Sequence, residues 1–120
     1  MDTAHIILTT LTLTACLLSA AIDFAAATGA PRWNFLIVGM EKIGVPRSWL
    51  PWLGAAKAAA GFGLLAGFWL PPLGTAAAAG LVLFFIGALV FHTRARDYAP
   101  GGQHLFLAMA TGTLVLTMTA

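Results

Sequence analysis

Residues 6–28 read IILTTLTLTACLLSAAIDFAAAT, an apolar run that is interrupted only by hydroxyl side chains and by Asp23. A helix needs about 20 mostly apolar residues to cross the hydrocarbon core of a bilayer. In lipid, the threonines of this run can bond to carbonyls of their own helix or to a neighbouring helix. Because the run is long and residues 1–5 hold no Lys or Arg, we expect a retained membrane-spanning helix rather than a cleaved signal peptide.

The composition of the whole chain is typical of a protein that faces lipid. Of its 120 residues, 60% are hydrophobic and 8% are charged, whereas a soluble domain carries about 25% charged residues. Only six residues are Lys or Arg, and apolar runs separate them. No basic stripe forms, so nucleic acid is not an expected partner.

The sequence lacks the motifs that usually hold a cofactor or a metal ion. Cys16 is the only cysteine and lies in the first apolar run, so no intramolecular disulfide and no Cys–His metal site are expected. We interpret it as a small packing residue. The sequence also lacks haem, iron–sulfur and nucleotide-binding motifs, so we predict neither a metal nor a cofactor.

We predict one all-α domain over residues 1–120, an integral membrane four-helix bundle. Its spans are expected at about residues 6–28, 50–70, 73–93 and 104–120. Pro71 and Pro72 separate the second span from the third, because proline lacks an N–H and biases its predecessor away from the helical region. Since this connection is short, the two spans should be antiparallel neighbours.

Residues 31–49, between the first and second spans, differ from the rest. They mix aromatic and aliphatic residues with four charged ones, and the apolar stretch at 35–40 is far too short to cross a bilayer. We predict an interfacial or re-entrant segment that lies on one end of the bundle. Trp33, Trp49 and Trp52 fit an aromatic belt beside it.

The distribution of basic residues predicts an orientation. Four spans place both termini and the Pro71–Pro72 hairpin on one side of the membrane, and this side has no Lys or Arg. The loops on the other side hold Arg32, Lys42, Arg47, Arg94 and Arg96. Because cytoplasmic loops are enriched in Lys and Arg, we expect a multi-pass protein of the bacterial cytoplasmic (inner) membrane with both termini outside.

Small residues indicate where helices approach closely. Gly63 and Gly67 form a small-xxx-small pair, and Gly80 and Gly87 repeat one heptad apart. The pattern leaves open whether they face helices of the same chain or of another copy. The sequence is therefore compatible with a homo-oligomer and with a partner protein in a membrane complex.

Two charged residues fall inside the predicted spans. At 1.5 Å per residue, Asp23 lies roughly 8 Å before the end of the first span and Lys57 roughly 10 Å after the start of the second. An unpaired charge at the bilayer centre costs about 2.5–3.5 kcal/mol even on the mildest scale. Because the spans are antiparallel, we predict that Asp23 and Lys57 form a pair.

Further ionisable residues are expected at the same end of the bundle. His92 and Arg96 are four residues apart and could share one helical face, while Arg94 and Asp97 could pair on another. Ionisable groups inside membranes commonly line substrate or proton paths. We take Asp23, Glu41, Lys57 and His92 as candidate catalytic residues, and Arg96, Asp97, Trp33, Phe35, Met40 and Trp52 as candidate ligand-binding residues.

Structural roles compete with these assignments. The Asp23–Lys57 pair could serve packing alone, or Lys57 could extend its ammonium to the headgroups. His92 could be a buried, hydrogen-bonded histidine, and the two arginines at 94 and 96 could be ordinary anchors at a helix end. The sequence does not decide between these interpretations.

The chain resembles the DoxX-like family of small four-helix membrane proteins along nearly its whole length. The resemblance lies in residues 41–46 (EKIGVP), in residues 53–61 (LGAAKAAAG) with their embedded Lys57, and in residues 80–88 (GLVLFFIGA), which continue to 92–97 (HTRARD). It implies relatives among the membrane subunits of quinone-dependent oxidoreductases. Some small bacterial membrane proteins of broadly similar build act on isoprenoid substrates.

We therefore predict a membrane-embedded site for a lipophilic small molecule, quinone-like or isoprenoid-like. The cavity should lie beneath residues 31–49 and be lined by Asp23, Lys57, His92 and at least one of Glu41 and Arg96. Acid–base chemistry there would suit isomerisation, cyclisation or epoxide opening. The alternatives are a non-catalytic subunit or anchor of a quinone-linked oxidoreductase complex and, third, a proton-coupled carrier.

Overall fold

The computed structural model describes residues 2–29, 31–96 and 102–119, and this part of the chain is helical, without strands. The predicted all-α class is therefore confirmed. Two short 3-10 turns, η1 (Pro31–Trp33) and η2 (Arg47–Trp49), flank the second helix. The helices are α1 (Thr3–Ala27), α2 (Asn34–Lys42), α3 (Leu50–Ala66), α4 (Pro71–Arg94) and α5 (Gly102–Thr119).

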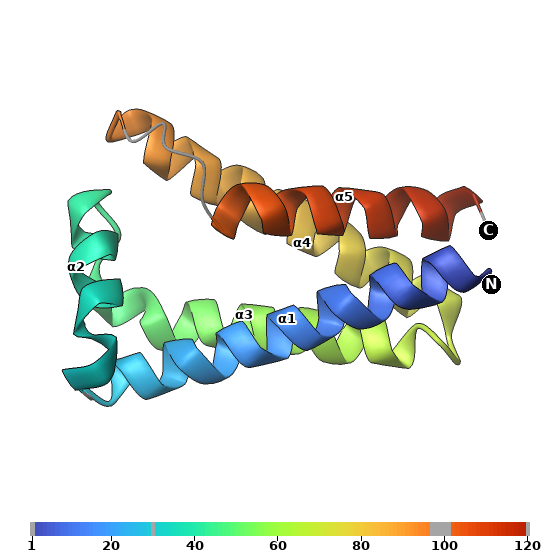
Figure 1. Ribbon diagram of the computed structural model, residues 1–120, viewed down its shortest axis with the longest axis horizontal. Helices are drawn as coiled ribbons and strands as arrows, with labels where there is room; N and C mark the ends of the chain where they lie inside the picture. The colour runs from blue at the N-terminus through green and yellow to red at the C-terminus, as the bar shows by residue number, and fades with distance from the viewer. Residues whose placement is uncertain (1, 30, 97–101, 120) are drawn as a thin grey trace.

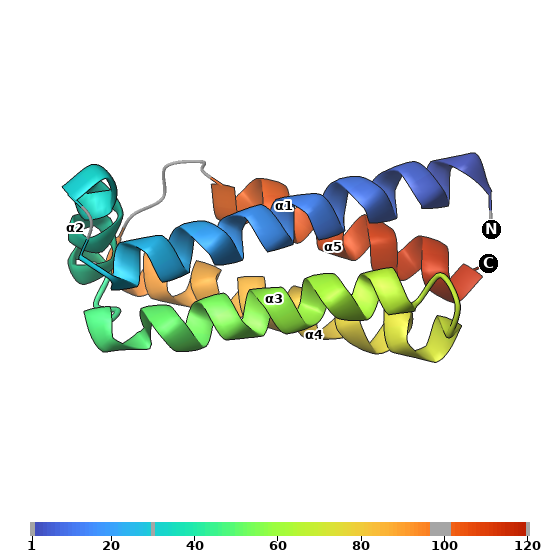
Figure 2. The same ribbon diagram turned by 90° about the horizontal axis from the view of Figure 1, so that it is seen from below.

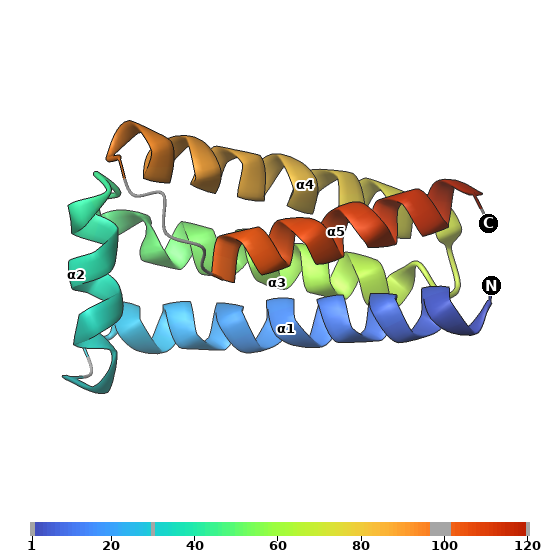
Figure 3. The ribbon, with the colours of Figure 1, turned by 45° about the horizontal axis from the view of Figure 1, so that its top comes forward.

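Four of the helices run along the length of the molecule, and α2 lies across one end (Figures 1 and 2). Packing contacts join α1 to α3, α3 to α4, α4 to α5 and α5 back to α1. Both termini lie at the end opposite α2, beside the connection between α3 and α4 (Figure 3). This arrangement places residues 31–49 over the end of the packed helices where α1 finishes and α3 begins.

Membrane crossing is supported for part of this arrangement. By length and apolar composition, α1 and α4 are able to cross a bilayer. The helix α3 has 17 residues, and the apolar helix at His104–Thr119 is also shorter than a typical span. Four spans and an interfacial α2 therefore stay predictions.

The second predicted span ends earlier than expected. The helix α3 ends at Ala66, and Leu70 has non-helical backbone angles, φ −125° and ψ 85°. Leu70 precedes Pro71, which disfavours the helical conformation at the residue before it. The turn at 67–70 therefore reverses the chain before α4 begins at Pro71.

Small residues allow α3 and α4 to touch near this turn. A Cβ atom added to Gly67 would lie 2.5 Å from Gly74 Cα, and one added to Gly63 would lie 2.8 Å from Ala77 Cβ. These two glycines thus face a helix of the same chain. Gly80 and Gly87 differ, because a Cβ atom at either position would meet nothing within 4 Å.

The packed helices enclose a core that every long helix enters. Its buried members come from α1, α3, α4 and α5, and Cys16 is fully buried among them, as expected of a packing residue. A threonine of α1 shows both of the predicted uses of its hydroxyl: Thr12 Oγ1 donates to Leu8 O at 2.8 Å and lies 3.1 Å from Thr113 Oγ1 of α5. The core residues are Leu13, Cys16, Leu64, Ala78, Leu81, Phe85 and Ala110.

A second, smaller cluster attaches α2 to the end of the molecule. Ile37 of α2 is buried against Ala26 near the end of α1 and Leu50 at the start of α3. Trp33 and Met40 are partly buried around the same cluster. This small cluster packs α2 against the ends of α1 and α3.

Candidate functional site

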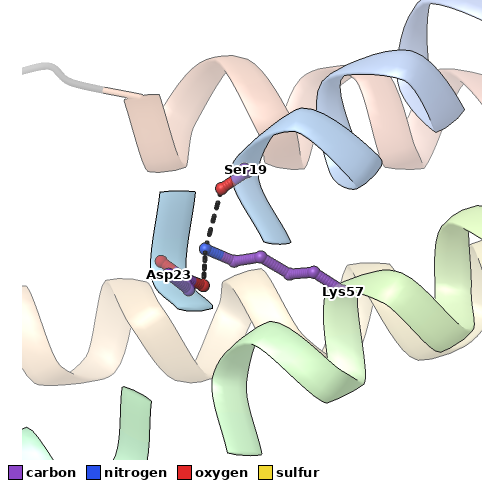
Figure 4. A network of polar contacts seen from close by, with 3 residues as sticks. All are labelled: Ser19, Asp23 and Lys57. Carbon is purple, nitrogen blue, oxygen red and sulfur yellow. Dashed lines mark hydrogen bonds and ion pairs between the residues drawn. The ribbon is translucent and has the colours of Figure 1, made fainter. Parts of the chain in front are cut away.

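The two charges inside the predicted spans form an ion pair (Figure 4). Lys57 Nζ lies 2.9 Å from Asp23 Oδ2, and the side chains are 14% and 6% exposed. The ammonium also donates to Ser19 Oγ at 2.9 Å. Ser19 and Asp23 are four residues apart on α1, so both reach the same lysine from one helical face. The predicted pair is confirmed.

A glycine allows the carboxylate to lie between α1 and α3. Gly54 is one turn before Lys57, and a Cβ atom there would lie 3.2 Å from Asp23 Cβ and 3.3 Å from the Phe24 ring. A larger residue would separate the helices at this point. Gly54 thus allows α1 and α3 to approach closely, and Lys57, one turn later on α3, pairs with the Asp23 carboxylate.

The third contact of the ammonium is with an aromatic ring. Lys57 Nζ lies 5.8 Å from the centroid of the Phe84 ring of α4, within range of a cation–π interaction. A lysine ammonium carries three N–H donors. Asp23 and Ser19 are its oxygen partners within residues 2–29, 31–96 and 102–119. One N–H is thus left to meet either the ring or a bound molecule.

A cavity of about 430 Å³ lies beside this ion pair and beneath α2. Every helix contributes to its wall, which is mainly aromatic and aliphatic. Asp23, Lys57 and His92 are its ionisable residues. The remaining lining residues are Leu36, Met40, Ile43, Val45, Trp49, Leu53, Phe84, Phe85, Gly87, Ala88, Phe91 and Phe106.

The predicted cavity is thus present, but one part of the prediction is wrong, since neither Glu41 nor Arg96 reaches it. Leu36 and Met40 are four residues apart and present one face of α2 to the cavity, and the next residue, Glu41, is turned roughly 100° away. Arg96 is not on the helical face of His92, because α4 ends at Arg94 and Arg96 has a positive φ of 59°. Both side chains are exposed.

The predicted ligand-binding residues divide in the same way. Met40 lines the cavity, whereas Phe35 and Trp52 are exposed on the outside of the molecule. Trp33 packs on the cluster that holds α2 and contacts the Phe35 ring, with centroids 6.1 Å apart. Asp97, and with it the predicted Arg94–Asp97 pair, lies outside the described residues.

Sequence reasoning missed Ser19, Gly54 and the aromatic wall from α4. Ser19 could have been found, because it lies one turn before Asp23 on the same face. Phe84 and Phe91 could not be distinguished from other apolar residues of a span that is hydrophobic all round. No group of three or more His, Cys, Asp or Glu side chains suited to a metal ion occurs in the described part of the chain.

Comparison with known proteins identifies one family. The sequence model of the DoxX-like family matches residues 7–119, which include α1 from residue 7 onward, all of α2 to α5 and every described residue of the cavity wall. No curated protein and no solved structure matches the chain. Membership of this family does not specify a reaction, because function depends on the residues of the site.

Proposed function

Since the chain belongs to the DoxX-like family, we propose that it is a multi-pass protein of the bacterial inner membrane that holds a quinone-like or isoprenoid-like molecule beneath α2. The observation that carries this proposal is the cavity of about 430 Å³ with Lys57, Asp23 and His92 in its wall. Sites for small molecules are typically apolar pockets of about 300–1,000 Å³ with a few polar groups that fix the orientation.

The polar end of the cavity favours a neutral ligand with an oxygen acceptor. Asp23 and Lys57 already neutralise each other, so a charged ligand would enter without a counterion and lose its hydration. A carbonyl or hydroxyl oxygen could instead accept the N–H of Lys57 that has no oxygen partner among the described residues. The apolar remainder of the ligand would pack against Phe84, Phe91 and Trp49.

The same groups suit acid–base chemistry on such a ligand. Asp23 Oδ2 lies 2.9 Å from Lys57 Nζ, so in this proposal Asp23 orients the lysine and acts as a positioning residue. Lys57 is then the hydrogen-bond donor to the ligand oxygen, and His92 is the group able to gain or release a proton. Protonation-driven isomerisation, cyclisation or epoxide opening would use this division of roles.

A second candidate is a non-catalytic membrane subunit or anchor of a quinone-linked oxidoreductase complex. The observation in its favour is that Asp23, Ser19 and Lys57 satisfy one another without a ligand. The exposed Phe35 and Trp52, at the same end, would then contact a partner protein. In this case the cavity would be a packing defect that lipid tails fill.

Mass spectrometry of organic extracts from the purified protein tests the first proposal. We expect a quinone or isoprenoid to co-purify with the wild type and with the control Lys42→Met, whose lysine is exposed and does not line the cavity. Loss of a hydrogen bond to a charged group should reduce retention about tenfold in Lys57→Met. The double variant Asp23→Asn/Lys57→Met leaves no stranded charge, and it should show the same loss while purifying normally.

A second matched pair tests the role of the histidine. His92→Ala should impair activity in a complementing host, while His104→Ala, at an exposed position of α5 outside the cavity wall, should not. If Lys57→Met and Lys42→Met retain the same compound equally and His92→Ala complements fully, the bound-ligand proposal fails. The subunit function then becomes the better account.

A further inference from the structure

A second cavity, of about 360 Å³, lies at the opposite end of the molecule. It is formed where the N-terminal part of α1 and the C-terminal part of α5 approach the connection between α3 and α4 (Figure 3). Leu64, Phe68 and Pro71 supply apolar wall, and His5, Thr9 and Thr117 supply polar groups. None of the lining residues that the structure describes is Asp, Glu, Lys or Arg.

The hydrogen bonds around His5 determine which ring nitrogen carries the proton. Thr117 Oγ1 donates its hydrogen to Thr113 O at 2.8 Å. In its 3.0 Å contact with His5 Nε2 the hydroxyl is therefore the acceptor, and Nε2 carries the hydrogen. Asp2 is occupied elsewhere, since its Oδ1 accepts from the backbone N–H of His5 at 2.8 Å. No Asp or Glu side chain is among the described lining residues and His5 Nδ1 has no partner among them, so in this tautomer a donor placed beside Nδ1 would give it a hydrogen bond.

Two buried polar atoms in this wall have no partner among the described residues. They are His5 Nδ1 and Thr9 Oγ1, and each residue is only 4% exposed. The contrast with Thr12, about one turn further along α1, is clear, because its hydroxyl is bonded to Leu8 O and Thr113. A buried polar group without a partner costs about 1–3 kcal/mol, so a bound group that satisfies both atoms would be stabilised.

We propose that this cavity is a second binding site, for a neutral molecule with a hydroxyl group on a small apolar body. The hydroxyl donates to His5 Nδ1 and accepts from Thr9 Oγ1, which lie on the same face of α1, one turn apart. The apolar body packs against Leu64, Phe68 and Pro71. The site is distinct from the cavity beneath α2, and it does not depend on what that cavity holds.

Fluorine NMR on the purified protein in lipid nanodiscs tests this site with para-fluorophenol as the probe. We expect saturable binding to the wild type and about tenfold weaker binding to Thr9→Val, which removes the hydroxyl at nearly constant volume. The matched control is Thr10→Val, because Thr10 is the adjacent residue and is exposed. Thr9→Ser keeps the hydroxyl and should bind like the wild type, which separates loss of the hydrogen bond from loss of folding.

A second probe and a second readout complete the experiment. Para-fluorotoluene lacks the hydroxyl, so it should bind more weakly than the phenol and should not distinguish Thr9→Val from Thr10→Val. With isotope-labelled histidine, the nitrogen signal of His5 Nδ1 should change from a bare to a hydrogen-bonded acceptor as the phenol is added. Equal affinity of the two probes would mean that the site does not recognise the hydroxyl, and an unchanged Nδ1 signal at saturation would mean that His5 does not bind it. Either result would overturn the proposal.

One further arm identifies the source of the hydroxyl. Dioctanoylglycerol in the nanodisc presents a lipid hydroxyl at the membrane surface. If it displaces the phenol from the wild type, the natural occupant belongs to the lipid class. If the phenol stays bound, the occupant is a free molecule of about the size of the probe. Both results support the binding site, and they distinguish a lipid occupant from a small free molecule.

Discussion

Lys57 is held by three groups of different chemistry: the carboxylate of Asp23, the hydroxyl of Ser19 and the ring of Phe84. A buried ion pair adds little net stability, because the attraction between the charges is offset by their desolvation. Its energetic importance appears when one partner is removed, since the other charge is then left unpaired in a medium of low dielectric.

The first prediction follows from this asymmetry. Asp23→Asn and Lys57→Met should each lower the free energy of unfolding by about 3–5 kcal/mol. The double variant should be clearly more stable than either single variant, because it leaves no stranded charge. Unfolding of the purified protein in mixed micelles measures all three, and Lys42→Met serves as the exposed-lysine control. If the two single effects simply add in the double variant, the residues do not form a pair.

The sequence alone predicted the positions of some residues of the site but not of others. Asp23 and Lys57 were predictable, because each is an isolated charge within an apolar run and pairing avoids a large cost. Glu41 and Arg96 were not, because their directions depend on which face α2 presents and on where α4 ends. A helical face can be extrapolated only as far as the helix continues.

Among the elements, α2 has the weakest attachment to the rest of the molecule and the most direct effect on the cavity. Leu36 and Met40 form part of the cavity wall, and buried Ile37 connects the helix to Ala26 and Leu50. Elements with few buried apolar contacts open locally at low free-energy cost. Opening of α2 would be a route by which a molecule enters the cavity.

The second prediction tests this attachment. Ile37 is 6% exposed, whereas the adjacent Val38 is 55% exposed. Ile37→Ala should remove about 2 kcal/mol or more of packing free energy from the contact, and should therefore speed amide hydrogen exchange across Asn34–Lys42. Val38→Ala should leave the exchange nearly unchanged, and exchange within α1 should be the same in both variants. Equal protection of α2 in the two variants would show that the cluster does not hold it.

The sequence predicted the existence and order of the elements more reliably than their ends. Apolar runs and prolines located the four long helices and the separate segment between the first two. The end of α3 at Ala66 was missed, because a turn of apolar residues continues the hydrophobic run without continuing the helix. The cavity could be inferred only from the convergence of charges, since its aromatic wall carries no periodic pattern of its own.

At the scale of the whole molecule, the two ends differ in charge. The end covered by α2 holds Arg32, Lys42 and Arg47, and α4 ends there at Arg94. The opposite end, with both termini, has no Lys or Arg. A protein that crosses a membrane with this asymmetry should orient its basic end towards the cytoplasm.

The third prediction is that both termini face away from the cytoplasm. A periplasm-active reporter fused after residue 120 should be functional, and a cytoplasm-active reporter at the same position should be silent. Moving basic residues to the terminal side should weaken this preference, because the bias of Lys and Arg sets the orientation. A functional cytoplasmic reporter in the unaltered protein would reverse the assignment and place α2 outside.

The distance along the chain between Asp23 and Lys57 has a consequence for biogenesis. Synthesis from the N-terminus delivers α1, with its carboxyl group, to the membrane well before α3 and its lysine have left the ribosome. Until then the helix carries an unpaired acidic group, which disfavours insertion by at most about 2.5–3.5 kcal/mol, the cost of such a group at the bilayer centre. We therefore expect α1 to insert stably only when α3 arrives, so that the helices enter as a unit and a chain truncated before Lys57 is released or degraded.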